Sequence, residues 1–243
     1  MPLREIKVRD EGAGIYDAQY VEQHGRWHDI VEKKVIRDTL DVKPTDIILD
    51  AGCGTGRITL ELASRCKIVY ATDFSANSIS VLNWKLLTDE VQNVVLSTSD
   101  ISEPIDVPEK VDKVVSIQVI QHMPEPARAL NNLYDRLRTG GVCVVSVYND
   151  RPFFLGALFG KRLPKEGVFP NGIPYWRYNA GELITMFKDC GFKQVSVKGC
   201  VNVSWYAKAN SWLFYPVTIL DTLLSKFDLS CKLGTYLVCR GVK

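Results

Sequence analysis

The chain has 243 residues, of which 46% are hydrophobic and 24% are charged, a composition that is typical of globular proteins and excludes a mainly disordered chain. Its 30 Lys and Arg residues nearly balance 28 Asp and Glu residues, and the net charge of +2 argues against a nucleic-acid partner. The 7 cysteines form no C-x-x-C pair, which argues against a disulfide framework and against a metal site. With no signal-peptide pattern and no apolar run of membrane length, we expect a cytoplasmic protein with one domain over residues 1–243 and no integral membrane segment.

Apolar runs of strand length alternate with helical patterns along the chain. The runs begin near residues 47, 68, 94, 114 and 142 and are continuous, as in strands buried on both faces of a parallel sheet. Later, Leu183 and Phe187 lie one helical turn apart, and Asn179 followed by Glu182 predicts the N-terminal cap of that helix. The alternation predicts an α/β fold in which helices cover both faces of an open sheet.

Three segments lie outside this alternation. Residues 1–40 precede the first strand and contain a helical pattern. Residues 149–178 form a long connection rich in Pro, Gly and aromatic residues, and long connections beyond sheet strands are often lids or substrate loops. Residues 199–233 predict a helical insertion.

The helix expected in that insertion, over residues 212–227, is amphipathic. Its apolar face includes Leu220 and Phe227, and its polar face includes Asp221 and Ser225. The interpretation we favour is that the apolar face covers the sheet edge. A dimer partner or peripheral contact with a membrane surface is the open alternative.

A glycine-rich turn is the strongest motif in the sequence. The run Asp50-Ala51-Gly52-Cys53-Gly54-Thr55-Gly56 follows the first strand and precedes a helix. Glycines let a backbone turn sharply and approach a ligand closely, and a helix N-terminus offers unpaired N–H groups. Two further carboxylates, Asp73 and Asp100, follow the next two strands, where they could meet a ribose and an adenine. We therefore expect a nucleoside cofactor at this edge of the sheet.

The glycine spacing distinguishes between nucleoside cofactors. A dinucleotide fingerprint is G-x-G-x-x-G, whereas this chain has G-x-G-x-G followed by Arg57. Asp50, at the end of the strand, would also place a charge beside a pyrophosphate. A cofactor with a cationic centre and a single carboxylate fits better, which describes S-adenosylmethionine (SAM).

These segments resemble the motifs of class I SAM-dependent methyltransferases. Residues 50–56 resemble the first motif, residues 71–75 the second, residues 99–101 the third and residues 117–124 the segment after the fourth strand. The resemblance implies a Rossmann-like, seven-stranded, mostly parallel sheet, with an antiparallel strand near residues 234–239. It also implies an N-terminal helical cap over residues 1–40. The long connection over residues 149–178 is expected to be an inserted lid.

The resemblance also implies roles for individual residues. The glycines would pack around the methionine moiety, Asp73 would hold the ribose hydroxyls, and Phe74 would cover the adenine. Asp100 and Ile101 would contact the adenine edge and face, and Gln118 would lie beside the methyl donor. The cofactor-binding residues expected are Asp50, Gly52, Cys53, Gly54, Gly56, Arg57, Asp73, Phe74, Asp100, Ile101, Gln118 and Val119, and the product is S-adenosylhomocysteine (SAH).

His122 is the candidate general base, because it follows the fourth strand and an imidazole titrates near neutrality. The alternative is that His122 forms only local hydrogen bonds. His24 and His28 are weaker candidates on the N-terminal helix. Aromatic residues before and within that helix, namely Tyr16, Tyr20 and Trp27, could face the sulfonium or pack in the core.

The segment 149–178 indicates the kind of acceptor. Its 5 Lys and Arg residues outnumber its 2 Asp and Glu residues, and aromatic residues lie between them. A basic, aromatic lid suits an anionic or amphipathic small molecule, although the aromatic residues could instead fill the core. The substrate-binding residues expected are Tyr20, His122, Arg151, Trp176 and Tyr178.

The sequence thus predicts methyl transfer from SAM to a nitrogen or oxygen atom of a small or amphipathic, anionic metabolite, by a monomer or homodimer. One alternative is a protein or lipid-linked acceptor. Another is a non-catalytic SAM-binding subunit. A nicotinamide oxidoreductase is a third, which the glycine spacing opposes.

Overall fold

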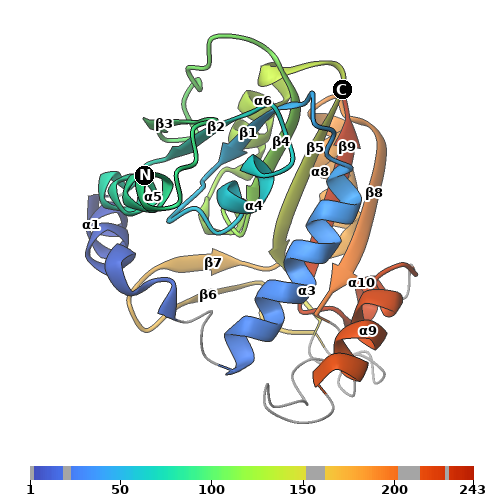
Figure 1. Cartoon of the computed structure of the whole chain (residues 1–243). Coiled ribbons are helices and arrows are strands. Elements are labelled where there is room, and N and C mark those ends of the chain that lie inside the picture. Colours follow the sequence, from blue (N-terminus) through green and yellow to red (C-terminus); the bar gives the residue numbers. More distant parts are fainter. Residues whose placement is uncertain (1–2, 19–22, 152–161, 202–213, 228–229) are drawn as a thin grey trace.

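Figure 1 shows the computed structural model, which describes residues 3–18, 23–151, 162–201, 214–227 and 230–243. Seven strands form one sheet in the order β3-β2-β1-β4-β5-β9-β8, in which β9 is antiparallel to both of its neighbours. The strands are β1 (Ile47–Ala51), β2 (Ile68–Asp73), β3 (Val94–Thr98), β4 (Val111–Ile117), β5 (Leu137–Tyr148), β8 (Lys193–Cys200) and β9 (Tyr236–Val242). The predicted Rossmann-like sheet and its antiparallel strand are confirmed.

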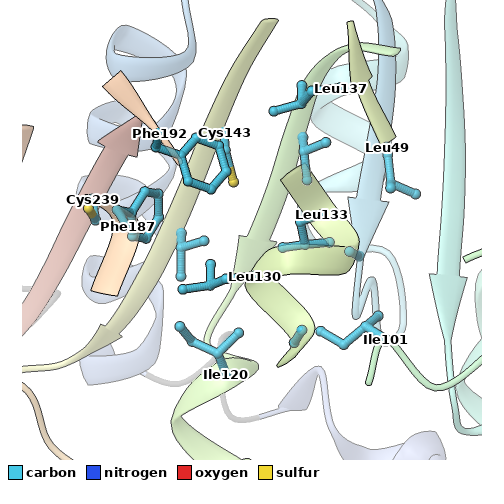
Figure 2. Packing of buried hydrophobic residues seen from close by; sticks show 14 of the residues in the cluster. Leu49, Ile101, Ile120, Leu130, Leu133, Leu137, Cys143, Phe187, Phe192 and Cys239 are labelled. Atoms are coloured by element: carbon cyan, nitrogen blue, oxygen red, sulfur yellow. The ribbon is translucent and has the colours of Figure 1, made fainter. Parts of the chain in front are cut away.

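Two hydrophobic clusters cover the two faces of this sheet. The cluster in Figure 2 packs side chains of α6 and α8, such as Leu130, Leu133 and Phe187, against the central strands. The other cluster packs α3, α4 and α5 against the opposite face, with Trp27 fully buried at its centre. The helices are α1 (Leu3–Gly12), η1 (Ala13–Ile15), α3 (Gln23–Leu40), α4 (Thr59–Ala63), α5 (Ala76–Thr88), η2 (Ile120–His122), α6 (Pro126–Arg136), α8 (Ala180–Asp189), α9 (Phe214–Leu224) and α10 (Ser230–Leu233).

Local sequence signals fix several of these elements. The capping box predicted at α8 is present, since Asn179 Oδ1 accepts from the Glu182 N–H at 3.0 Å and Glu182 Oε2 accepts from the Asn179 N–H at 2.9 Å. In the segment expected to be a lid, a two-stranded hairpin pairs β6 (Glu166–Val168) with β7 (Pro174–Trp176).

None of the helices in the described part of the chain combines the length and apolarity that a bilayer crossing requires.

Helix α9 is turned the opposite way from the favoured interpretation. Asp221 is fully buried and Ser225 is buried, whereas Leu220 and Phe227 are exposed, the latter at 64%. Ser225, the residue after α9, donates its hydroxyl to the Asp221 carbonyl at 2.9 Å, so the hydroxyl is satisfied and tolerates burial. Amphipathicity identified two faces of this helix correctly, and the inference that the apolar one packs inward is wrong.

Candidate active site

The glycine loop lies between β2 and the residues that follow β4. The N–H groups of Gly52 and Cys53 both donate to the Thr72 carbonyl, at 2.7 and 3.0 Å. Gly52 has φ +83°, and a Cβ atom there would lie 2.4 Å from Cγ2 of Val119. Only glycine therefore allows this loop to approach the β4 side so closely.

Asp73, the last residue of β2, is held by the same loop. Its Oδ2 accepts from the Gly54 N–H at 2.8 Å, and its Oδ1 accepts from the Ser75 N–H at 2.9 Å. Burial raises the pKa of Asp73, although both backbone donors act in the opposite direction. Each carboxylate oxygen has one of these donors and retains capacity to accept a second hydrogen bond.

Two adjoining pockets open at the carboxyl ends of the central strands. Six of the predicted cofactor-binding residues line the first pocket, namely Gly52, Gly54, Asp73, Phe74, Gln118 and Val119. The second pocket extends from it toward β5 and β9. Both pockets are lined by Arg9, Tyr16, Gln118, His122, Asn171 and Ile173, so they share one wall.

The N-terminal segment covers the first pocket. Ser75 Oγ, at the start of α5, donates to Asp10 at 2.5 Å. Asp17 accepts from Thr55 Oγ1 at 2.7 Å and from Lys85 Nζ at 2.5 Å. These bonds fasten residues 3–17 to the glycine loop and to α5, and they carry Arg9 and Tyr16 into the pocket wall.

Three further predicted cofactor-binding residues do not line the first pocket in the described part of the chain. Asp50 is buried and accepts from Thr59 Oγ1 at 2.7 Å, and burial raises its pKa to about 6. Gly56 packs against α5, because a Cβ atom there would lie 2.2 Å from Cδ1 of Leu82. Cys53 is also buried, and burial raises the pKa of its thiol.

Arg57, Asp100 and Ile101 are also absent from the described lining of the first pocket. Arg57 binds α3 instead, with Nη1 2.9 Å from Asp29 Oδ1 and Nη2 2.7 Å from Glu32 Oε2. Asp100 accepts from both the backbone N–H and the hydroxyl of the serine two residues later. Ile101 packs in the core beside α6 (Figure 2).

His122 lies in η2 and lines both pockets, and its hydrogen bonds define its tautomer. Nδ1 is 2.8 Å from the Pro174 carbonyl, which only accepts, so Nδ1 carries the proton. Gln121 Oε1 accepts from the Tyr148 N–H at 2.7 Å, so the Gln121 amide nitrogen faces His122 Nε2 at 3.3 Å and donates to it. Burial and the nearby Arg9 lower the pKa of His122 to about 4. The ring is therefore neutral at physiological pH, and the lone pair of Nε2 accepts a hydrogen bond. This arrangement agrees with the alternative that His122 forms only local hydrogen bonds.

Three described cations of the lid segment are paired with acids, and none of the three lines either pocket. Arg162 Nη1 and Lys165 Nζ each lie 3.3 Å from Oδ2 of the buried Asp150, and Lys165 also binds Glu182. Arg151 Nε is 3.9 Å from the other oxygen of Asp150.

Three of the expected substrate residues therefore stand away from the pockets. Arg151, Trp176 and Tyr178 do not line either of the two pockets in the described part of the chain. Tyr178 packs against the core cluster of Figure 2. Tyr20 and the lid residues 152–161 lie outside the described residues.

The second pocket is built mainly from residues that the motifs did not identify. Rings of Tyr148, Phe169 and Tyr236 form one side of it, with centroids 6.1 Å apart between Tyr148 and Phe169 and 5.7 Å apart between Tyr148 and Tyr236. His28 from α3 meets Tyr236 edge to face at 5.9 Å. Tyr148 is the last residue of β5, and Tyr236 is the first residue of the antiparallel β9. An aromatic residue at each of these neighbouring strand ends was a sequence signal that could have predicted this side of the pocket.

The sheet order and the glycine loop define the fold class as that of the class I SAM-dependent methyltransferases, and comparison with known proteins agrees. The chain belongs to the methyltransferase domain family, whose model matches residues 43–189. The ubiquinone biosynthesis O-methyltransferase of Pseudomonas putida is 26% identical over 146 residues, which cover 55% of this chain and 63% of that protein. The chain spans less than two thirds of the length of the curated relatives it matches.

Two solved structures show the same fold. A SAM-dependent methyltransferase from Thermotoga maritima, described as a possible histamine N-methyltransferase, has a TM-score of 0.65 at 19% identity and covers 98% of this chain and 99% of its own. Phosphoethanolamine N-methyltransferase 2 of Haemonchus contortus, solved with phosphomonomethylethanolamine and SAH, has a TM-score of 0.66 at 18% identity. The matched region covers 96% of this chain and 57% of the Haemonchus contortus protein.

Proposed function

We propose that this protein transfers a methyl group from SAM to a nitrogen or oxygen atom of a small metabolite held in the second pocket. The observation that carries the proposal is the pair of adjoining pockets at the carboxyl edge of the sheet. The first pocket is bounded by the glycine loop and Asp73, and the second is bounded by aromatic rings. Two pockets that share a wall suit two reactants that must meet, and positioning them in line supplies much of the catalysis.

The first pocket fits SAM by its residues. Asp73 retains acceptor capacity for two ribose hydroxyls, and Phe74 offers a ring for the adenine. Gly54 has no atom within 4 Å of the Cβ position, so the loop leaves open space for the methionine moiety. When bound, the cofactor supplies a methyl group on a cationic sulfur. Asp50, Cys53 and Gly56 would support the glycine loop from the side away from the pocket.

The second pocket receives its positive charge from the N-terminal cap. Arg9 of α1 is the cationic side chain among the described residues shared by the two pockets. It lowers the pKa of His122, which places its charge near the acceptor side of the shared wall. An anionic group on the acceptor would therefore meet Arg9 rather than Arg151, and His122 would act as a neutral wall residue. A base function for His122 stays a prediction.

Calorimetric titration of the purified protein with SAH, with NADH as the control, tests the proposal. We expect micromolar SAH binding and no NADH binding. NADH binding without SAH binding would overturn the cofactor assignment in favour of a nicotinamide enzyme. Turnover of labelled SAM with a panel of small amines and hydroxyl compounds then distinguishes an enzyme from a non-catalytic subunit.

A further inference from the structure

Gln118, the residue that follows β4, occupies the wall between the two pockets. It has φ +61°, a conformation that side-chain-bearing residues rarely adopt, and its N–H donates to the Ser146 carbonyl at 3.0 Å. A residue held in this conformation is kept there by its surroundings, and such residues cluster at functional sites. The backbone of Gln118 is therefore fixed where the two reactants would meet.

The Gln118 side chain is fixed as well. Its Nε2 donates to Glu32 Oε1 at 2.8 Å and to Ser146 Oγ at 3.0 Å, while the Ser146 hydroxyl donates to the same Glu32 oxygen at 2.8 Å. A flipped amide would place its oxygen against the Glu32 carboxylate, which would be repulsive. Arg57 binds the other Glu32 oxygen at 2.7 Å and holds this buried carboxylate in place. The amide orientation is thus determined by charge.

One consequence is an acceptor atom without a donor. Oε1 of Gln118 has no hydrogen-bond partner among the described residues, in a side chain that lines both pockets. It is closed to solvent in the structure, so a ligand donor reaches it when the groups that cover it move aside. A buried acceptor in this state is costly, and a donor on a ligand would remove the cost. Oε1 accepts only, because it is the carbonyl oxygen of an amide.

We propose that Gln118 Oε1 accepts an N–H of the methyl acceptor, and that this acceptor is therefore a primary or secondary amine. The inference rests on the proposed methyl transfer and narrows its substrate class from nitrogen or oxygen to an amine nitrogen. Gln118 is the specificity-determining residue, and Glu32 and Ser146 are positioning residues that act through its amide.

An amine nitrogen and a hydroxyl oxygen differ in whether they must lose a proton before they attack the methyl group. An uncharged amine attacks with its N–H intact: its lone pair forms the N–C bond, the C–S electron pair leaves with sulfur, and the surplus proton of the new ammonium passes to water. Gln118 Oε1 and the Glu32 carboxylate behind it favour the positive charge that develops on nitrogen. A hydroxyl group must lose its proton, which an amide cannot remove, and an oxyanion would be repelled by Oε1. A tertiary amine has no N–H to offer, so methylation should stop there.

Sinefungin tests this without knowledge of the natural acceptor, because it is the SAM analogue that carries an amine in place of the methylsulfonium. Its ammonium can donate to Gln118 Oε1, whereas SAH has no donor at that position. We expect the full-length protein to bind sinefungin about tenfold or more tighter than SAH, the effect of one charged hydrogen bond. Gln118→Met, of similar shape, should abolish that preference, which is the ratio of the sinefungin and SAH affinities of the same variant.

Asn171→Ala is the matched control, since Asn171 also lines both pockets but is exposed and its Oδ1 accepts from the Ile173 N–H. This variant should keep the sinefungin preference. A wild-type ratio below about two, or a preference that survives Gln118→Met, overturns the proposal. If Gln118→Met does not fold, the wild-type ratio decides. Absence of SAH binding to the wild type would instead contradict the proposed cofactor.

Discussion

Glu32 and Gln118 lie 86 positions apart in the sequence, and their side chains share a hydrogen bond of 2.8 Å. Glu32 belongs to α3, which precedes the sheet in the chain, whereas Gln118 follows β4 in its middle. Through this bond the N-terminal cap becomes part of the wall between the two pockets. Glu32 is also the partner of Arg57, so one buried carboxylate joins α3 to the glycine loop and to β4.

Glu32→Gln should therefore affect both stability and ligand preference. Removal of the charge leaves Asp29 as the acidic partner of the mostly buried Arg57 among the described residues, and we expect a loss of about 3 kcal/mol in the free energy of unfolding. The Gln118 amide would no longer have a charged partner that fixes its orientation, so the sinefungin preference should fall severalfold. Urea denaturation and calorimetry measure the two effects.

Asp29→Asn is the control for Glu32→Gln, because Asp29 binds Arg57 at 2.9 Å but does not bind Gln118 in the described structure. It should reduce stability and preserve the sinefungin preference. An equal loss of preference in both variants would show that Glu32 acts through Arg57 rather than through Gln118.

Two glycines of the loop should respond differently to alanine. Gly52→Ala places a methyl group 2.4 Å from Val119 Cγ2, and we expect it to destabilise the fold by about 2–4 kcal/mol. At Gly54 no atom lies within 4 Å, so Gly54→Ala should cost only about 1 kcal/mol, the strain of a positive φ. Its methyl group enters the first pocket, and SAH affinity should fall at least about tenfold. Unchanged SAH binding by folded Gly54→Ala would contradict the assignment of this pocket.

Asp73→Asn tests the ribose assignment. The change replaces one oxygen by an amide group that donates rather than accepts, and we expect SAH affinity to fall by about 1–3 kcal/mol in calorimetry. Asp100→Asn is the comparison, because Asp73 lines the first pocket and Asp100 does not in the described structure. It should weaken SAH binding less than Asp73→Asn does. The reverse order would restore Asp100 as the principal carboxylate for the nucleoside.

The sequence was sufficient for the sheet and for the glycine-loop side of the first pocket because these signals are local. A strand, three glycines and the carboxylate at the end of β2 lie within residues 47–73, so their spacing carries the geometry. The second pocket could not be found in this way, since Arg9, Glu32, Tyr148 and Tyr236 meet only after the whole sheet has formed. The expectation that basic residues of the lid face the acceptor came from composition and meets a related limit. Composition shows that charges are present and cannot show that Asp150 pairs with them.

The fold of α9 illustrates the same limit. Periodicity separates its apolar positions from its polar ones, but it contains no information about which face the rest of the protein covers. Helix α9 contacts α3 and β8, which are distant in sequence, and in this position Asp221 is buried and Leu220 is exposed. A pattern of period 3.6 therefore predicts the helix and leaves its rotation open.

Asp17 should control how fast the cofactor exchanges. Its carboxylate ties the N-terminal segment to Lys85 Nζ and Thr55 Oγ1 beside the first pocket. Asp17→Asn removes the charge from a partly exposed pair, and we expect SAH to dissociate roughly fivefold faster in stopped-flow experiments. Glu11→Gln, which loses only the exposed pair with Lys7 on α1, is the control and should not change the rate. Equal dissociation rates in both variants would mean that this segment does not gate the pocket.

The lowered pKa of His122 predicts that the stability of the protein depends on pH. The folded protein keeps the imidazole neutral down to a pKa of about 4, because burial and Arg9 disfavour its charge, whereas the unfolded chain takes up a proton near the ordinary value of 6.5. Between these values the unfolded state binds more protons, so stability falls as the pH falls from 6.5 toward 4. This residue accounts for a loss on the order of 3 kcal/mol over that window. His122→Asn should flatten the difference between urea denaturation at pH 7 and at pH 4.5. An unchanged difference in the variant would show that other groups cause the loss, and a kinetic pKa near 6.5 that vanishes with His122 would instead support the base function.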